Sequence, residues 1–417
     1  MFVLFIFALI IGCGATHKTG TTTTTSPSSP QTPTPTPIPT PVSPTAVSAE
    51  YFGMHVHDIS NWPSVSFGSL RLWDAGVTWP SLEPAPGQWN FVNLDAIISK
   101  CAQNNVDVSM VLGLSPQWAS ARPTEPSAYQ PGNAAEPGNI QDWRDFVQAV
   151  ATRYKGRIHN YEIWNEPNDP TFFSGTPAKM LELATEAYKI LKQVDPSVTV
   201  LSPAATEQGG LSWLDQYLGI GGGNVADVIA YHLYVHPNPP ENMLALLTQV
   251  KAIMAQHSQS SKPVWDTETG WHSPSTFTQA DEASFVVRSY LLAGSAGVSR
   301  FYWYAWDDRD WVTLQLTNTD GSLRPSAQAF AIVRGWMLNS SPPQCSSDSS
   351  GTWTCALTQA SVTSHVVWNQ NGTATFAVPQ GWNPALMIDD LGQHTILSPG
   401  SATLQISTAP VWLGAGS

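Results

Sequence analysis

The chain has 417 residues, which is more than one ordinary domain requires and fits one large barrel with an appended module. Charged residues make up 12% of it, the net charge is −13 and there is no basic run, which argues against a protein that binds nucleic-acid phosphates. Eighteen tryptophans are an unusually large number. Because flat indole faces pack against the C–H faces of sugar rings, this composition favours a protein that binds neutral polyols.

The N-terminus has the pattern of an export signal. The apolar run MFVLFIFALIIG is too short for a membrane helix but fits the hydrophobic part of a secretory signal, and no Lys or Arg precedes it. Ile10-Ile11-Gly12-Cys13 resembles a bacterial lipobox, which implies cleavage before Cys13 and lipidation of its thiol. We therefore expect a signal over residues 1–19 and a cell-surface or periplasmic lipoprotein, with plain secretion as the alternative.

Residues 20–47 are expected to form a tether. They contain ten Thr and eight Pro and almost nothing that a core could bury. Such a segment is predicted to be extended and polyproline-like, and to hold a domain away from a surface.

From residue 51 onward, short apolar runs alternate with amphipathic helices. The predicted strands are Tyr51–His57, Ser69–Trp73, Asp107–Leu112, His159–Trp164, Thr199–Ser202, Val228–Leu233, Val264–Thr267 and Arg300–Tyr304. The predicted helices include Asp142–Tyr154, one that opens at Thr176-Pro177, Glu241–His257, Gln279–Ala293 and Ser326–Leu338.

Eight strands that alternate with helices predict an α/β fold, a (β/α)₈ TIM barrel, over residues 48–338. A doubly wound open sheet is the alternative. It would usually show a glycine-rich phosphate turn after the first strand, whereas this strand ends in His55-Val56-His57-Asp58.

After residue 339 the helical period disappears. Short alternating segments, among them Thr352–Thr358 and Ser364–Trp368, predict a small C-terminal β-sandwich over residues 339–417, which would cover the flank of the barrel. Cys345 and Cys355 lie ten residues apart and are expected to form a disulfide in an exported protein. Cys101, on the apolar face of a predicted helix, is expected to be an inert buried thiol.

Two glutamates follow barrel strands at positions where reacting groups belong. Glu166 lies in Trp164-Asn165-Glu166-Pro167-Asn168 after strand four, and Glu268 lies in Trp265–Trp271 on strand seven. Strands four and seven lie roughly across the barrel mouth from each other, so both carboxylates can face one bound molecule. A pair of carboxylates that flanks an acetal oxygen is what retaining glycoside hydrolysis requires, whereas a single Glu at either place is usually a solvated loop residue.

These motifs, together with Tyr231-His232-Leu233-Tyr234 on strand six, resemble the 4/7 glycoside hydrolases of clan A, most closely family 39 and next family 5. The resemblance covers residues 50–340. It implies that Glu166 is the acid/base, Glu268 the nucleophile of a retaining β-glycosidase, and Asn165 the ligand of the sugar 2-hydroxyl. His232 and Tyr234 would orient the nucleophile and neighbouring hydroxyls.

Other polar residues have open roles. Asp266 shares a strand face with Glu268 and is the alternative nucleophile, but it lies about 6–7 Å deeper, where a carboxylate is expected to orient its neighbours. Arg71 on strand two is a candidate partner of Glu162, either at the substrate or in a structural ion pair. His57 is expected, with His55, to bind sugar hydroxyls or to brace the pocket.

Two tryptophans are candidates for contact with the sugar. Clan relatives place a tryptophan after strand eight as a platform under the sugar, and Trp306 is the candidate here, with Trp303 as the alternative. Trp118, after strand three, is a second candidate wall of the site.

The overall expectation is a monomeric enzyme that acts on a neutral oligo- or polysaccharide, without a metal or a cofactor, and contacts the membrane only through its lipid. One alternative is a non-catalytic carbohydrate-binding lipoprotein. The other is a metal-dependent amidohydrolase barrel, in which His55, His57, His232 and Asp307 would bind the metal. That class needs a bridging Lys on strand four and a His on strand five, and this sequence has Glu166 and Pro203 there.

Overall fold

The computed structural model describes residues 46–271, 277–307, 314–398 and 400–415. The predicted signal, Cys13 and nearly all of the predicted tether lie outside these residues. Val47, which we expect to end the tether, is buried and exchanges backbone hydrogen bonds with the segment after the last barrel helix, so the folded part includes it. No helix among the described residues has the length and apolar character to cross a bilayer.

A closed ring of parallel strands forms the centre of residues 46–306, with the order β5-β4-β3-β2-β1-β9-β8-β7-β6. The strands are β1 (Phe52–His55), β2 (Ser69–Leu72), β3 (Asp107–Leu112), β4 (Asn160–Ile163), β5 (Thr199–Leu201), β6 (Ala205–Thr206), β7 (Ile229–His232), β8 (Val264–Thr269) and β9 (Val298–Trp303). A parallel bridge between Leu201 and Val228 joins β5 to the start of β7 and closes the ring. The predicted (β/α)₈ barrel is confirmed.

The fifth barrel strand is divided into two pieces. β5 pairs with β4 and β6 pairs with β7, and Pro203 lies between them. Proline has no N–H to donate to a neighbouring strand, so the ladder is interrupted there. The nine strands therefore correspond to eight barrel positions.

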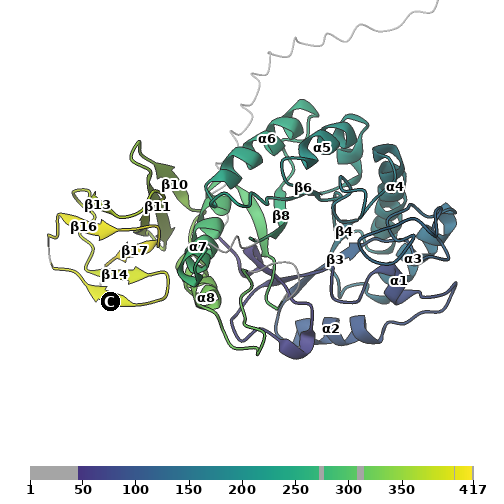
Figure 1. The fold of residues 1–417 in the computed structure, drawn as a ribbon, viewed down its shortest axis with the longest axis horizontal. Helices are drawn as coiled ribbons and strands as arrows, with labels where there is room; N and C mark the ends of the chain where they lie inside the picture. The colour runs from purple at the N-terminus through teal and green to yellow at the C-terminus, as the bar shows by residue number, and fades with distance from the viewer. Residues whose placement is uncertain (1–45, 272–276, 308–313, 399, 416–417) are drawn as a thin grey trace, which may run out of the picture. The chain divides into compact units, whose positions relative to one another are not determined.

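The helices lie outside the strands (Figure 1). They are α1 (Trp79–Leu82), α2 (Val92–Gln103), α3 (Ile140–Arg153), α4 (Pro177–Val194), α5 (Gly210–Gly219), α6 (Asn242–Gln256), α7 (Gln279–Ser295) and α8 (Pro325–Met337). Their starts follow local sequence signals: Thr176 caps α4 by accepting from the backbone N–H of Lys179, and Thr278 and Asp281 form a capping box at α7. Cys101 is buried on α2, and burial raises the pKa of its thiol to about 12.

The C-terminal region is an antiparallel β structure, as predicted. A six-stranded sheet has the order β10-β11-β12-β17-β14-β15, and β13 pairs with β16. The strands are β10 (Gln344–Ser347), β11 (Thr352–Gln359), β12 (Val362–Asn369), β13 (Ala374–Ala377), β14 (Leu386–Asp389), β15 (His394–Ile396), β16 (Thr403–Ile406) and β17 (Val411–Gly414). Side chains of the sheet and of the two-stranded ribbon share one apolar cluster, as the layers of a sandwich do.

The predicted disulfide is present. Cys345 of β10 and Cys355 of β11 are directly paired across the sheet, with Cα atoms 3.9 Å apart, and their sulfurs are bonded. The barrel and the C-terminal strands are also in contact, since the Trp368 indole N–H donates to Glu241 at 2.8 Å and the Ser284 hydroxyl donates to Asp390 at 3.0 Å. This agrees with a module that covers a flank of the barrel.

Candidate active site

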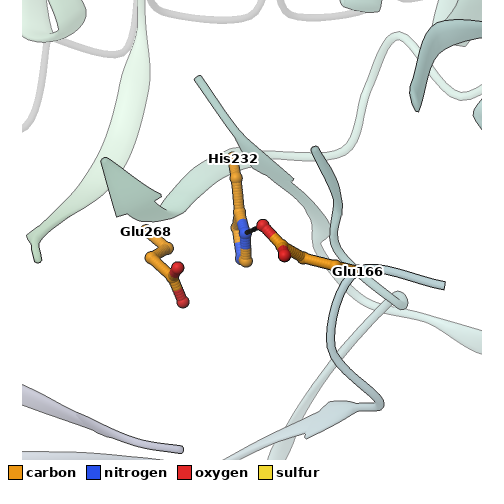
Figure 2. Close-up of side chains that lie close together, drawn as sticks. All are labelled: Glu166, His232 and Glu268. Carbon is orange, nitrogen blue, oxygen red and sulfur yellow. Dashed lines mark hydrogen bonds and ion pairs between the residues drawn. The ribbon is translucent and has the colours of Figure 1, made fainter. Parts of the chain in front are cut away.

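Glu166 and Glu268 converge at the C-terminal mouth of the barrel. Glu166 lies just beyond β4 and Glu268 lies within β8, and they are 7% and 4% exposed. One oxygen of each carboxylate and one ring nitrogen of His232 all lie within 4.8 Å of one another. Figure 2 shows the two glutamates pointing toward each other from the two sides of the His232 ring.

The backbone at Glu166 adopts the left-handed conformation, with φ of 43°. A non-glycine residue in this region is uncommon and costs about 1–3 kcal/mol, and it persists only where neighbouring contacts hold it. The Glu166 N–H donates to the Ala204 carbonyl at 2.9 Å, which ties this turn to the segment between β5 and β6. The direction of the Glu166 side chain is therefore set by the barrel and not by a free loop.

Two donors hold the Glu268 carboxylate. An Arg71 guanidinium nitrogen donates to Oε2 at 2.7 Å, and the Tyr234 hydroxyl donates to Oε1 at 2.9 Å. Both bonds favour the ionised form, and the arginine contact is charge-assisted. These two contacts oppose the effect of burial and favour the anion, which is the form a nucleophile needs.

Arg71 connects Glu268 to two further residues. It donates to both oxygens of Glu162, at 3.1 and 2.6 Å, and to the Asn165 side-chain oxygen at 2.7 Å. Because the oxygen of Asn165 accepts from Arg71, its amide NH₂ is the group left to meet a substrate hydroxyl. Arg71 is both the structural partner of Glu162 and a positioning residue for Glu268 and Asn165.

Replacing Arg71 with methionine is expected to lower the free energy of unfolding by about 3–5 kcal/mol, because Glu162 would remain buried without its partner. The same change should lower kcat by about 10²-fold, since Glu268 and Asn165 would lose their alignment. Urea unfolding and steady-state kinetics measure the two effects.

The control is the double variant Arg71→Met/Glu162→Met. It removes the buried ion pair as a whole, so stability should return while kcat stays low. A double variant with the kcat of the unmodified protein would show that Arg71 has only a structural role.

His232 contacts the other glutamate. Its Nδ1 lies 2.8 Å from Glu166 Oε1, and the ring is completely buried at the end of β7. Burial lowers the pKa of His232 to about 4, so the imidazole is neutral near pH 7. A neutral ring orients the Glu166 carboxyl without placing a positive charge that would remove its proton.

The two glutamates titrate in an unusual range. Burial raises the pKa of Glu166 to about 7 and that of Glu268 to about 7; the charges of Glu207 and Asp169 add to the rise for Glu166, and the charge of Glu166 adds to the rise for Glu268. The direct contact with Arg71 favours the anion on Glu268, so the shared proton resides mainly on Glu166. One protonated and one ionised carboxyl group is the pairing that acid-assisted displacement needs.

Asp266 lies deeper in β8 and does not face Glu166. It is fully buried and accepts from the Thr269 hydroxyl at 2.6 Å and from the Leu233 N–H at 3.2 Å. These contacts hold the end of β7 against β8, which positions Tyr234 and Glu268.

The two candidate tryptophans make contacts within the fold, and their contact with a sugar stays a prediction. Trp306 is 2% exposed and belongs to the main hydrophobic cluster, as does Trp303, which stacks on Trp271. Trp118 packs edge-on against Trp79 among the helices, and its indole N–H donates to the Glu83 carbonyl. The large apolar area of these indoles is used in packing, which the sequence pattern alone does not distinguish from a sugar contact.

Residues that the sequence analysis did not single out line the mouth. Asp74, two residues after β2, accepts hydrogen bonds from the hydroxyls of Tyr129 and Tyr304. The Tyr304 ring lies edge-on to His55 and His57, with centroids 4.8 and 5.2 Å away. The place of Asp74 just beyond a strand end was a signal that could have identified it, whereas Tyr129 lies in a long loop without a pattern.

His55, the last residue of β1, and His57, two residues beyond it, brace this side of the mouth. His55 Nε2 lies 3.0 Å from the Thr267 carbonyl, and the His57 backbone N–H donates to Asp307 at 2.8 Å. Within the described residues, the metal-ligating atoms that come together are those of Glu166, His232 and Glu268, and not those of His55 and His57. A guanidinium 2.7 Å from Glu268 disfavours a cation at that cluster, so this chemistry does not support the amidohydrolase alternative.

A family model, Glycosyl hydrolases family 39, matches residues 85–303, which contain both glutamates, His232 and Tyr234. The chain belongs to glycoside hydrolase family 39. A β-xylosidase of Geobacillus stearothermophilus is 25% identical to this family 39 chain over 244 residues, which are 52% of this chain and 48% of that protein. A β-xylosidase of Caldicellulosiruptor saccharolyticus is 27% identical over 154 residues, 35% of this chain and 31% of that protein. The matched part of this family 39 chain therefore spans about half the length, or less, of these curated relatives.

Solved structures of family 39 proteins share the fold. A family 39 glycoside hydrolase from Bacteroides cellulosilyticus WH2 has a TM-score of 0.72 at 22% identity, over 90% of this chain and 83% of that one. A family 39 β-xylosidase from Caulobacter crescentus has a TM-score of 0.66 at 14% identity, over 89% of this chain and 97% of that one. At these identities the likeness concerns the fold, and the C-terminal strands are part of it.

Proposed function

We propose that this family 39 chain is a retaining β-glycosidase that hydrolyses β-glycosidic bonds of a neutral oligo- or polysaccharide. The observation that carries the proposal is the approach of Glu166 and Glu268, with an oxygen of each within 4.8 Å. Carboxyl groups about 5–5.5 Å apart are typical of retaining glycosidases, whereas inverting enzymes separate them by about 6.5–9.5 Å to admit a water molecule.

In the first step, an oxygen of Glu268 attacks the anomeric carbon and forms an ester with it. The bond from this carbon to the glycosidic oxygen breaks, and the proton of Glu166 passes to that oxygen. Arg71 and Tyr234, which donate to Glu268, fix its orientation for the attack. The Asn165 amide is placed to donate to the sugar 2-hydroxyl, a bond that strengthens at the transition state.

In the second step, Glu166 is a carboxylate and acts as the base. It takes a proton from water, the water oxygen attacks the anomeric carbon, and the ester bond to Glu268 breaks. The pKa of Glu166 is expected to fall during the intermediate, because Glu268 no longer carries a charge beside it. Two displacements at one carbon give overall retention of the β configuration.

A panel of p-nitrophenyl β-glycosides and neutral polysaccharides tests the proposal. Xylosides come first in the panel, because two relatives are named β-xylosidases. Turnover of at least one β-glycoside, lost in the variants described in the Discussion, is the expected result. A folded protein that binds these sugars and turns over none would favour a carbohydrate-binding protein.

We also propose that the protein is exported and carries lipid on Cys13. The apolar run before Cys13 supports this, and the disulfide between Cys345 and Cys355 fits an oxidising compartment. Replacing Cys13 with serine should abolish incorporation of radiolabelled palmitate in a bacterial host and release the protein from the membrane fraction. Membrane attachment that persists in this variant would contradict the lipid anchor.

A further inference from the structure

A polar groove lies beside the catalytic residues, between the start of α5 and the first half of α6. Its volume is about 340 Å³, and its lining includes Glu207, Gln208, Tyr234, Asn242, Ala245 and Gln249. This volume is at the lower end of the range, roughly 300–1,000 Å³, that small-ligand pockets occupy. We propose that the groove binds the sugar unit that leaves in the first step, and that it selects a neutral unit over an acidic one; this inference rests on the proposed function.

Tyr234 joins the groove to the reaction centre. Its side chain belongs to the groove lining, while its hydroxyl donates to Glu268 at 2.9 Å. The groove is also on the side of the acid/base, since Glu207 follows β6, the next barrel position after β4, which carries Glu166. The leaving unit is attached to the oxygen that Glu166 protonates, so it must extend to this side.

The backbone of Glu207 is fixed by the strand that carries His232. The Glu207 N–H donates to the His232 carbonyl at 3.2 Å, and the Tyr231 hydroxyl donates to the Glu207 carbonyl at 2.5 Å. Glu207 has a φ of 57°, a left-handed conformation that is unfavourable for a residue other than glycine and needs such support. Glu207 belongs to the groove lining and its charge contributes to the raised pKa of Glu166, so the groove lies within electrostatic reach of the acid/base.

The other groove side chains provide groups that suit hydroxyls. Gln208 donates to Gln249 at 2.9 Å, so two amides connect the segment before α5 to α6, and Asn242 begins α6. An amide both donates and accepts, as a sugar hydroxyl does. Ala245 and the buried Leu246 provide an apolar surface for the C–H face of a ring.

Charge supplies the selectivity. The carboxylate of Glu207 accepts hydrogen bonds from neutral hydroxyls, whereas it repels the carboxylate of a uronic acid in the same place. With the carboxylates of Glu207 and Glu268 nearby, an acidic leaving unit would add a third negative charge. The groove therefore fits a neutral leaving sugar.

The test compares two substrates that share the glycone, xylobiose and p-nitrophenyl β-xyloside, or the corresponding pair for the sugar that the panel identifies. Gln249→Ala removes an amide from the groove, and Ala245→Phe fills it from an exposed helix position. Gln256→Ala and Ala252→Phe are matched controls, because both lie seven residues further along α6, are exposed and are absent from the groove lining.

Gln249→Ala should lower kcat/KM for xylobiose by about 3–10-fold more than for the aryl xyloside, the effect of one neutral hydrogen bond. Ala245→Phe should give a larger difference, and both controls should leave the ratio of the two kcat/KM values unchanged. The charge effect is tested with an aldobiouronic acid in which xylose is attached to a uronic acid. The unmodified protein should cleave it at least about tenfold more slowly than xylobiose. Glu207→Gln should reduce this difference in rate.

Equal losses on both substrates in Gln249→Ala and Ala245→Phe would overturn the groove as the leaving-sugar site, even if the protein is an active glycosidase. Ala245→Phe at an exposed position keeps the test valid if Gln249→Ala proves unstable. Absence of turnover on every β-glycoside in the unmodified protein would instead overturn the proposed function.

Discussion

Replacing Glu268 with alanine is expected to abolish turnover of every substrate of this family 39 chain. Without the carboxylate no ester to the anomeric carbon can form, and substrates with good leaving groups cannot compensate for the missing nucleophile. With a dinitrophenyl glycoside as substrate, kcat should fall to the detection limit of the assay. Arg71 would keep Glu162 and Asn165 as partners, so the free energy of unfolding should change little by comparison.

Added azide provides the control for this variant. Alanine leaves a space beside Arg71 on the face opposite the leaving group, which a small anion can enter. Azide attack from that side should restore activity and give the α-glycosyl azide, because a single displacement inverts the configuration. A β-glycosyl azide from this variant would contradict the assignment of Glu268 as the nucleophile.

Replacing Glu166 with alanine should have a different outcome. A dinitrophenyl leaving group needs no proton, so formation of the glycosyl-enzyme should continue and be visible as a burst of dinitrophenol. Natural glycosides, whose leaving oxygen must be protonated, should lose about 10²–10⁴-fold in rate, the range for a single acid/base group. Stopped-flow absorbance and sugar release measure the two quantities.

The pH profile gives the matched control. In the unmodified protein kcat/KM should fall at high pH, because Glu166 loses its proton. It should also fall at low pH, because Glu268 gains one. Burial raises the pKa of each glutamate to about 7. For a phenyl β-glycoside, whose leaving oxygen needs a proton, Glu166→Ala should lose the fall at high pH and keep the fall at low pH. Azide should give the β-glycosyl azide, since it attacks the glycosyl-enzyme. An unchanged alkaline limb would show that Glu166 is not the acid.

The positions of the two glutamates could be predicted from the sequence because they depend on strand order. Each motif follows an apolar run of strand length, and parallel strands in a barrel end at the same face. The burial of Asp266 does not test the two-residue period, because all six residues of β8 are buried and the pairing with β9 is irregular between Asp266 and Thr269.

The aromatic residues of the site could not be predicted in the same way. Trp303, Tyr304 and Trp306 are adjacent on one strand end and chemically alike, and their environment depends on packing between distant parts of the chain. The core takes Trp303 and Trp306, whereas Tyr304 reaches Asp74 across 230 residues of sequence. The groove at α5 and α6 could not be predicted either, because two loops form it. One of its residues, Glu207, has a left-handed backbone, a conformation that a sequence usually signals with glycine.

The configuration of the first sugar released tests the central claim most directly. Proton NMR of the anomeric signals, recorded in the first seconds to minutes of hydrolysis of an aryl β-glycoside, distinguishes the β from the α product before mutarotation mixes them. Two displacements through Glu268 require that the β anomer appears first and the α anomer grows in afterwards. An α anomer formed first would mean a single displacement by water. The two carboxylates are too close together to leave space for that water molecule, so this result would contradict the account.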